Sequence, residues 1–404
     1  MKELSTVKNT PNLRHLRAFC SVAKRHSISR ASEEIFLSQP AITQAISKLE
    51  ESLSSPLFDR KVEGMFLTDA GKIWFERVSR AIKILDNGAL SILAKGSNVR
   101  HHISQITATQ LRALVAVTQY HNFSLAGRNL SISQSSLHRA CKELEQLLEV
   151  SLFEKSKVGV NPTDAAKILA RASKLAFTEI RQAHDEVMAL KNLDSSELLI
   201  GSMPLPRVVL LPRVINQFSR KRPSVSINLI DGTYDDLLQH LRYGDIDFLI
   251  GALRIPAVAE DIVQIPLFST PLSFVARYDH PIFNETEITL ERLSQHAWVA
   301  PKQGTPTRAA FDRMFKDFNM QSQQGLVESN SQILIREVLL GSDRLSIISA
   351  HQIQHELNEK QLRVVPYPLP HTSRPIGVAL RSDFLPTATQ SEFLTLLKSV
   401  SSQF

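Results

Sequence analysis

Apolar residues recur at helical spacing in the first part of the chain and predict three helices. Residues 13–25 carry one apolar stripe, and a second, short helix follows Ser29. The third helix runs from Ser38 to about Ser54, with Ser38 as a suitable N-cap and Pro40 tolerated in the first turn. Its buried face is expected to contain Ile42, Ala45, Ile46, Leu49 and Leu53.

The opposite face of this third helix is polar and suits a DNA major groove. Short donors and acceptors match base edges, and a cation matches phosphate. The candidate DNA contacts are Ser38, Gln39, Pro40, Thr43, Gln44 and Ser47. An ordinary amphipathic surface helix shows the same alternation, so this stretch alone leaves both interpretations open.

A hairpin and then a long helix are predicted next. Strand-forming residues flank Gly64 within 56–68, and three helices followed by such a wing are typical of a winged helix-turn-helix. The long helix begins near Thr68 and carries a coiled-coil seam, formed by Phe75, Val78, Ile82, Leu85, Ala89 and Ile92. No neighbouring segment remains to cover this seam, so we expect a partner helix.

The same pattern restarts 95 residues further on. Residues 16–71 align without a gap with 111–166 and share 19 identities in 56 positions. A match of this extent predicts a second winged unit. A second long helix follows at about 164–191, with a seam of Leu169, Ala172, Ala176, Ile180, Ala183, Val187 and Leu190. The two long helices can pair within one chain or between chains, because the linker at 95–107 spans up to about 40 Å.

The two predicted units differ mainly on their exposed faces. The second recognition helix offers Ser133, Gln134, Ser135, His138, Arg139 and Lys142. The wing cations expected to contact phosphates are Arg60, Lys61, Lys155 and Lys157. Base reading is expected from Thr43, Gln44, His138 and Arg139, with Arg139 best suited to guanine. Exposed residues would diverge in this way if the two winged units bound different DNA sequences. They would also diverge if only one unit bound DNA and the other were a degenerate copy.

Beyond residue 197 the pattern changes to strands separated by helices. Strands are expected at 197–202, 224–230, 246–251, 272–277, 297–300, 345–349, 364–365 and 376–380. Helices are expected at 206–219, 233–242, 307–319, 331–340, 351–359 and 391–400. This alternation predicts parallel βαβ units and an α/β domain.

Charge is distributed unevenly between the two parts. Residues 1–192 hold 27 Lys and Arg against 18 Asp and Glu, a net charge of +9, whereas the remainder carries −2. The basic part therefore suits a polyanion such as DNA, and the other part does not.

Few residues suggest catalysis or metal binding. The two cysteines, Cys20 and Cys141, lie on apolar helical stripes and are expected to be buried. His351 and His355 share a helix face without an obvious third ligand, and no Gly-x-Ser-x-Gly, His-Glu-x-x-His or Walker-type motif occurs. No signal-peptide core and no long apolar run is found, so a cytoplasmic protein without cofactor, metal or membrane partner is expected.

Several motifs together resemble the LysR-type transcriptional regulators. They are SQPAI at 38–42, KLE at 48–50, PLFDR at 56–60 and LTDAG at 67–71, with looser copies SQSSL at 133–137, LFEK at 152–155 and PTDAA at 162–166. The later part matches through GSMP at 201–204, GDIDFLIG at 244–251 and RYDHP at 277–281. The stretch LIGALR at 249–254 most resembles the branch that regulates sugar uptake and aromatic-acid catabolism. The family normally has one winged unit per chain, so the extra unit here leaves operator geometry open.

The resemblance implies a multidomain protein with tandem winged units and a two-lobed, periplasmic-binding-protein-like effector domain. The expected boundaries are 12–71 and 107–166 for the winged units, 72–94 and 167–192 for the linker helices, and 197–404 for the effector domain. Its first lobe would hold 197–267 and 362–404, and its second lobe 268–361. Between the lobes, effector contacts are expected from Ser202, Met203, Pro204, Gly304, Thr305, Ser329 and Asn330. Serine and threonine at such positions also cap helices, with or without a ligand.

These features predict a DNA-binding regulator, not an enzyme, that senses a small molecule and changes its operator binding. Its expected partners are double-stranded operator DNA, a sugar or small organic or aromatic acid, further copies in a dimer or tetramer, and RNA polymerase as a candidate. The alternative is a cytoplasmic solute-binding or DNA-organising protein in which one winged unit only dimerises. The lack of a secretion signal and the basic N-terminal part argue against a transport protein.

Overall fold

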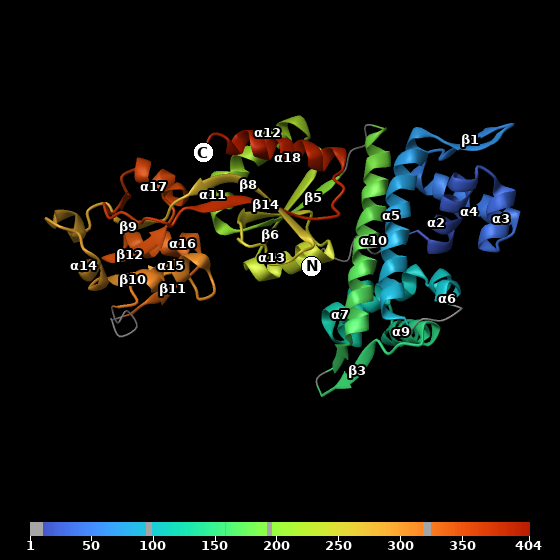
Figure 1. The fold of residues 1–404 in the computed structure, drawn as a ribbon, viewed down its shortest axis with the longest axis horizontal. Coiled ribbons are helices and arrows are strands. Elements are labelled where there is room, and N and C mark those ends of the chain that lie inside the picture. Colours follow the sequence, from blue (N-terminus) through green and yellow to red (C-terminus); the bar gives the residue numbers. More distant parts are fainter. Residues whose placement is uncertain (1–10, 94–98, 158, 192–195, 318–324) are drawn as a thin grey trace. The chain divides into compact units, whose positions relative to one another are not determined.

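The computed structural model describes residues 11–93, 99–157, 159–191, 196–317 and 325–404, which form two compact units (Figure 1). The N-terminal unit contains the chain up to Leu198 together with Ser224–Ser226 and Arg242–Asp245. The C-terminal unit contains the remainder up to Phe404. Part of the expected linker at 95–107, the expected boundary at residue 192 and the predicted helix end at 319 lie outside the described residues.

Three helices and a hairpin open the N-terminal unit, as predicted, although the second helix begins at Ile28 with Ser27 as its cap, so that Ser29 lies inside it. They are α2 (Leu13–Arg25), α3 (Ile28–Ile35), α4 (Gln39–Leu53), β1 (Phe58–Lys61) and β2 (Gly64–Leu67). Ser38 caps α4 by accepting from the backbone N–H of Ala41, and the five apolar residues expected on its inner face are all buried. The apolar stripe thus fixes which face of α4 remains in water.

The same order of elements recurs in α7 (Ala108–Tyr120), α8 (Phe123–Leu130), α9 (Gln134–Leu148), β3 (Phe153–Ser156) and β4 (Gly159–Pro162). Even the contacts that hold each hairpin are repeated. Gly64 and Gly159 adopt φ of 137° and 149°, and a Cβ on either would lie 2.4 Å from the carbonyl oxygen of His26 or His121. Glycine is required at both positions because the backbone approaches so closely there.

Two long helices, α5 (Asp69–Ile92) and α10 (Asp164–Ala189), pack against each other within the chain. Arg77 contacts Gln182 while Gly88 faces Ala172, so the helices run antiparallel. The buried seam residues include Val78, Leu85 and Ala89 of α5 and six of the seven predicted in α10, whereas the seventh, Leu190, is exposed. The expected partner helix is therefore the second long helix of the same chain.

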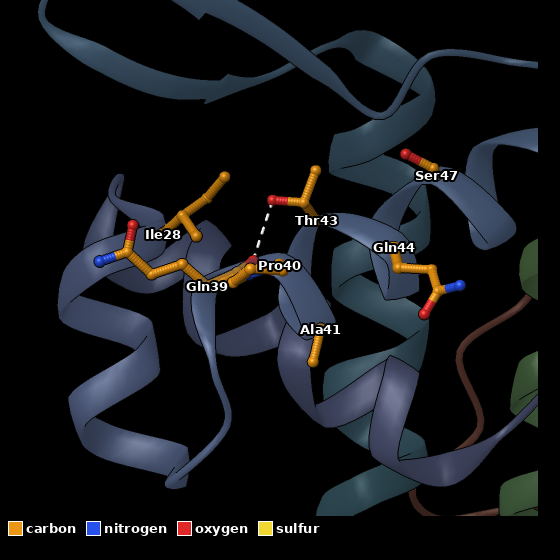
Figure 2. A pocket seen from close by; sticks show the side chains of 7 residues that line it. All are labelled: Ile28, Gln39, Pro40, Ala41, Thr43, Gln44 and Ser47. Atoms are coloured by element: carbon orange, nitrogen blue, oxygen red, sulfur yellow. Dashed lines mark hydrogen bonds between the residues drawn. The ribbon is translucent and has the colours of Figure 1, made fainter.

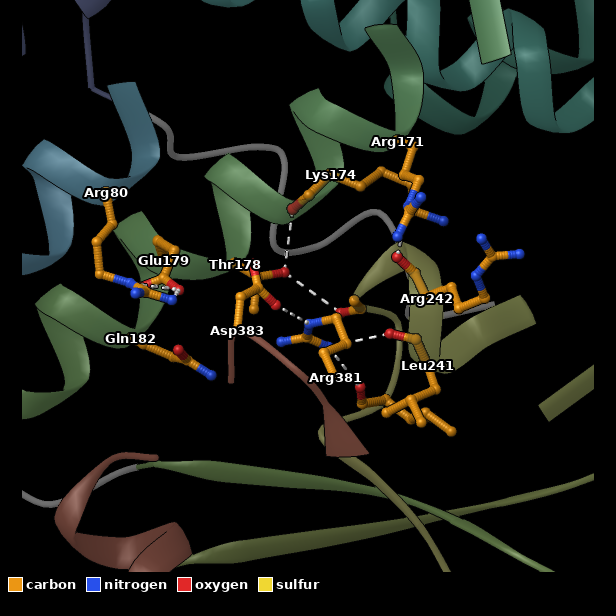
Figure 3. A network of polar contacts seen from close by, with 12 residues as sticks. Arg80, Arg171, Lys174, Thr178, Glu179, Gln182, Leu241, Arg242, Arg381 and Asp383 are labelled. Atoms are coloured by element: carbon orange, nitrogen blue, oxygen red, sulfur yellow. Dashed lines mark hydrogen bonds and ion pairs between the residues drawn. The ribbon is translucent and has the colours of Figure 1, made fainter. Parts of the chain in front are cut away.

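A buried ionic cluster that the apolar pattern did not predict interrupts this seam. The Arg77 side chain is only 3% exposed and donates to Glu179 at 3.2 Å, Gln182 at 3.0 Å and Glu186 at 2.8 Å. Arg80 also donates to Glu179, at 3.2 Å (Figure 3). Burying a guanidinium is tolerated only when acceptors replace its water, and α10 supplies three.

The expected linker was only partly right, because it contains a helix, α6 (Val99–Gln105). Ile103 of this helix and Ile106 just after it are buried in the hydrophobic core of the N-terminal unit. The polar composition of the segment concealed these two anchors.

The C-terminal unit contains two mixed five-stranded sheets. The first has the order β6-β5-β7-β14-β8 and the second β11-β10-β12-β9-β13. Their strands are β5 (Glu197–Ser202), β6 (Ser226–Asp231), β7 (Phe248–Ala252), β8 (Ile262–Thr270), β9 (Ser273–Arg277), β10 (Ala297–Ala300), β11 (Val327–Glu328), β12 (Arg344–Ile348), β13 (Leu362–Val364) and β14 (Arg374–Arg381). The predicted α/β class is confirmed, although antiparallel pairs accompany the parallel ones.

The helices of this unit are α11 (Pro204–Val209), α12 (Leu211–Lys221), α13 (Tyr234–Tyr243), α14 (Leu290–Ser294), α15 (Pro306–Met314), α16 (Gln332–Leu340), α17 (Gln354–Asn358) and α18 (Ala388–Ser401), with short 3₁₀ turns at Pro281–Asn284 and Ala350–Ile353. The single helix expected at 206–219 is two helices, and the one expected at 307–319 ends at Met314. Strand β8 was not predicted, because a bulge between Pro266 and Phe268 breaks its alternation. Strand β13, expected in the first lobe, pairs with β9 of the second sheet.

Replacing Arg77 by alanine should lower the free energy of unfolding of the N-terminal unit by about 3 kcal/mol, because it leaves acceptors of α10 buried without their donor. Urea denaturation followed by circular dichroism measures the change. Lys72→Ala, which removes an exposed ion pair with Asp69, is the control and should change stability little. Equal stability of the two variants would contradict a structural role for the cluster.

Candidate DNA-binding surfaces and effector site

The first candidate DNA surface is the polar face of α4. Gln39, Pro40, Gln44 and Ser47 are exposed and line an open groove together with Ile28, Ala41 and Thr43 (Figure 2). The Thr43 hydroxyl donates to the carbonyl oxygen of Gln39 at 3.0 Å, so it turns toward its own helix. Gln44 and Ser47 lie at one end of the groove in Figure 2, and because both are exposed their side chains can meet base edges.

The second candidate surface lies on α9 and carries more charge. Ser133 caps this helix, and Gln134, Ser135, His138, Arg139 and Lys142 are exposed. Arg139 donates to Glu143 at 2.8 Å with 82% of its side chain exposed, and Lys142 pairs with Glu145 at 2.6 Å. Exposed ion pairs contribute little to stability, so a guanine or a phosphate can take the place of the carboxylate on Arg139.

Gln39 and Gln134 connect helices within their units. Gln39 donates to the Ser29 hydroxyl at 3.4 Å, and at the equivalent position the Ser124 hydroxyl donates to Gln134 at 2.8 Å. Both glutamines thus bridge the turn that sets the angle between successive helices. This structural role accompanies the DNA contact that the sequence predicts for both glutamines.

The wing cations lie as expected on exposed positions. Arg60 and Lys61 are on β1, Lys155 is on β3, and Lys157 is in the turn that follows. The Lys61 ammonium lies 5.7 Å from the centre of the Phe66 ring, which orients it across the hairpin.

A carboxylate that sequence analysis missed ties each hairpin to its recognition helix. Glu50 accepts from the backbone N–H groups of Leu57 and Phe58 at 2.8 and 3.3 Å. Glu145 does the same for Leu152 and Phe153 at 2.8 and 3.1 Å. Both glutamates are identical in the internal repeat, and that identity is the signal by which they could have been found.

The pKa of Glu145 is lowered below its ordinary value. Burial by itself raises this pKa, but the hydrogen bonds from Lys142, Leu152 and Phe153 together outweigh that effect. The ionised carboxylate of Glu145 therefore stabilises the second winged unit, residues 107–166.

The candidate effector residues fall into two groups. Ser202 is buried at the end of β5 and donates to the carbonyl oxygen of Met203, and Pro204 begins α11. On the other sheet, Asn330 accepts from the backbone N–H of Lys302 at 3.0 Å, which joins the Gly304–Thr305 loop to the Ser329–Asn330 loop. Among the described residues no hydrogen bond links the two groups.

Several of these side chains already have a structural partner. Thr305 caps α15 by accepting from the N–H of Arg308 at 3.2 Å, and Ser329 accepts from the N–H of Ser331 at 3.0 Å. Thr305 is thus a helix cap, whereas Ser329 stabilises the turn before α16, which Ser331 caps. Contact with an effector stays a prediction for all seven.

The described part of the chain contains no group of three His, Cys, Asp or Glu residues that could hold a metal ion. Nδ1 of His351 lies 2.9 Å from the Thr270 hydroxyl. Cys20 and Cys141 are buried, and burial is the main cause that raises their pKa to about 11 and about 12. No helix among the described residues is long and apolar enough to cross a membrane.

Comparison with known proteins gives consistent matches along the chain. Residues 191–402 match a family described as LysR substrate binding domain. Residues 13–72 and, separately, 108–167 match one described as bacterial regulatory helix-turn-helix protein, lysR family. HTH-type transcriptional regulator GalR of Pseudomonas putida is 33% identical over 390 residues, or 96% of this chain and 97% of its own. HTH-type transcriptional regulator PcaQ of Agrobacterium fabrum is 23% identical over 299 residues, or 74% of this chain and 96% of its own.

Solved structures share the fold. Full-length OxyR from Pseudomonas aeruginosa has a TM-score of 0.52 at 24% identity, covering 72% of this chain and 93% of its own. CbnR, whose structure is described as that of a LysR family transcriptional regulator, has a TM-score of 0.50 at 17% identity, covering 72% of this chain and 98% of its own.

The stabilisation supplied by Glu145 should depend on pH. Because its pKa is lowered on folding, the contribution is fully present above the ordinary value of 4.5 and is lost as the pH falls through the lower, folded-state pKa. Glu145→Gln should therefore destabilise the protein at pH 7, and its difference from the wild type should shrink below pH 4.5. Urea denaturation at several pH values measures this, with Glu143→Gln as control. A difference that is constant with pH would refute the assignment.

Proposed function

The chain belongs to the LysR family of bacterial transcriptional regulators, and from this premise we propose that it reads its operator with two winged helix-turn-helix units carried on one chain. As a member of the family it is a DNA-binding regulator with an effector-binding domain, and its named relatives are regulators, not enzymes. The observation that carries the proposal is the repetition of one set of elements. Its hydrogen bonds recur at positions 95 residues apart, and the helix-turn-helix family matches both copies.

The antiparallel helix pair supports simultaneous use of both units. Taking the contacts of Gly88 with Ala172 and of Arg77 with Gln182 as the register, Asp69 and Asp164 are separated by about 40 Å along the pair. Successive major grooves on one side of B-DNA recur every ~34–36 Å. Two recognition helices held at the ends of this pair thus suit neighbouring turns of one operator.

The ionic cluster supports pairing of α5 with α10 instead of with a second α5. By the repeat, the positions of Glu179, Gln182 and Glu186 correspond to Ile84, Asn87 and Ser91 of α5. A symmetric pair of two α5 helices would bury Arg77 against these residues without a carboxylate. That arrangement is disfavoured because an unpaired buried charge is strongly destabilising.

The rest of the mechanism follows from the proposed roles of the residues. Gln44 and Arg139 would read bases, and the wing cations would neutralise phosphates. Copies would associate through their effector domains, and an effector bound between the lobes would favour one of two DNA-bound arrangements, with RNA polymerase as a candidate partner. The motif at 249–254 supports a sugar or a small organic or aromatic acid as effector.

Footprinting of the promoter region beside its own gene with Gln44→Ala and, separately, Arg139→Ala tests the proposal. Each substitution should remove protection over a different half of the footprint and weaken binding about fivefold or more, because each recognition helix would read its own half-site. Arg313→Ala removes an exposed arginine of the C-terminal unit and is the matched control. If Arg139→Ala left both affinity and footprint unchanged, the second unit would be a degenerate copy and the proposal would fail.

The wing cations should give the binding its dependence on salt. Lys155→Gln and Lys157→Gln should each lower the slope of log affinity against log salt concentration by about 1, with little change in sequence preference. Fluorescence anisotropy at several salt concentrations measures the slope. Lys316→Gln, an exposed lysine outside the N-terminal unit, should leave it unaltered.

A further inference from the structure

Two arginines of the C-terminal unit, Arg254 and Arg374, face each other across neighbouring strand ends. Strands β7 and β14 are antiparallel with Ala252 opposite Ile376, and the N–H of Leu253 donates to the carbonyl oxygen of Pro375 at 2.9 Å. One residue further along this register, Arg254 is opposite Arg374. Like charges directly opposite one another destabilise a sheet, so this juxtaposition needs a reason.

Both arginines are held in place by their surroundings. Gln264 binds the backbone of Arg254 from both sides, accepting from its N–H at 2.9 Å and donating to its carbonyl oxygen at 2.7 Å. The Arg254 guanidinium lies 4.3 Å from the centre of the Tyr234 ring. Arg374 donates through Nη1 to the hydroxyl of Thr307. Neither side chain is therefore free to move its charge far from the other.

Neither guanidinium forms an ion pair among the described residues, although Asp235 is near enough to raise the pKa of Arg254. Nη1 of Arg254 and Nε of Arg374 are buried without a hydrogen-bond acceptor, and no described carboxylate forms an ion pair with either arginine. By contrast, Arg308 in the same unit pairs with both Asp312 and Glu328. Unsatisfied buried donors on charged groups are costly, so a pair of them at one place calls for an explanation.

The charge of the pair persists at neutral pH. Burial, and then the charge of Arg254, lowers the pKa of Arg374 to about 10. Burial also lowers the pKa of Arg254, against a smaller opposite effect of Tyr234 and Asp235. Arginine stays protonated near pH 7, so two positive charges stand together, and the charge of Asp235 offsets that of Arg254 only in part.

We propose that Arg254 and Arg374 bind the carboxylate of a small organic acid, which is the effector of this regulator; the assignment rests on the proposed sensing function of the domain. Planar guanidinium groups match a carboxylate with paired hydrogen bonds. A neutral sugar would leave both arginines without an ion-pair partner, so the pair favours the acid among the two effector classes that the sequence left open.

The surroundings suit the organic part of such a ligand. Apolar side chains border the arginines: the Tyr234 ring is buried beneath the Arg254 guanidinium, and Met203 packs on Gly251 of β7, where a Cβ would lie 2.5 Å from the Met203 sulfur. Thr307 is in the first turn of α15, two residues after Thr305, which with Gly304 is among the predicted effector residues. The N-terminus of that helix favours an anion, in agreement with the charge of the arginines.

A double-mutant cycle on the full-length protein tests the pair without any ligand. Arg254→Gln and Arg374→Gln each remove one charge but keep a donor, and Arg363→Gln, at an exposed arginine of the same unit, is the matched control. Repulsion predicts that each single substitution raises the melting temperature relative to the control and that the double substitution gains less than the sum. Additive effects of the two substitutions would overturn the proposal.

The ligand arm compares sodium benzoate, sodium succinate and sodium phosphate with sodium chloride at equal ionic strength. The carboxylates should raise the melting temperature of the wild type and of Arg363→Gln by about 2 °C or more above chloride, and this gain should vanish in Arg254→Gln and Arg374→Gln. Carboxylates no better than chloride, or equally effective on the two variants, would refute the assignment. Stabilisation by phosphate alone would likewise overturn it in favour of an inorganic anion.

Failure here is separable from failure of the proposed DNA-reading function. Footprints recorded without added acid should be the same for the wild type, Arg254→Gln and Arg374→Gln. If the carboxylate arm fails while footprints still respond to Gln44→Ala and Arg139→Ala, only the arginine-pair assignment falls.

Discussion

The antiparallel contact of α5 with α10 is the interaction on which the N-terminal unit depends. One hydrophobic cluster runs from the first three helices through this pair to the second set. Small and branched apolar residues along the seam supply burial but would tolerate alternative partners. Arg77 restricts α5 to one partner helix. Its buried guanidinium needs hydrogen-bond acceptors, and α10 places Glu179, Gln182 and Glu186 opposite it along the helix pair. Direction, register and partner are thus set by one buried charge.

The C-terminal unit also buries arginine side chains, but there the chain does not supply each of their donors with an acceptor. Arg77 is buried and fully supplied with acceptors by its own chain, so it acts in folding. Arg254 and Arg374 are held near one another without an ion pair, and one nitrogen of each is buried without an acceptor, which is why we propose that they bind a ligand. The comparison explains why a buried arginine is informative only when its partners are known.

The repeat shows which residues the fold holds constant. Glycines at the hairpins and glutamates that clamp them are identical in both copies, since the backbone approaches too closely or exposes N–H groups that need an acceptor. The outward positions of α4 and α9 face water and are free to diverge. Divergence there is compatible with two readers, whereas the scaffold positions are constrained by packing.

The sequence by itself determined the repeated helices and hairpins, the cap at Ser38, the buried stripes and the α/β character of the second part. These features are local, since periodicity and capping depend on residues a few positions apart. It could not give α6 or β8, where polar composition or a bulge hid the pattern. Nor could it show that α10 covers α5 or that Arg254 meets Arg374. Those pairings join residues that are distant along the chain, and only the tertiary structure decides which buried charges find a partner and which do not.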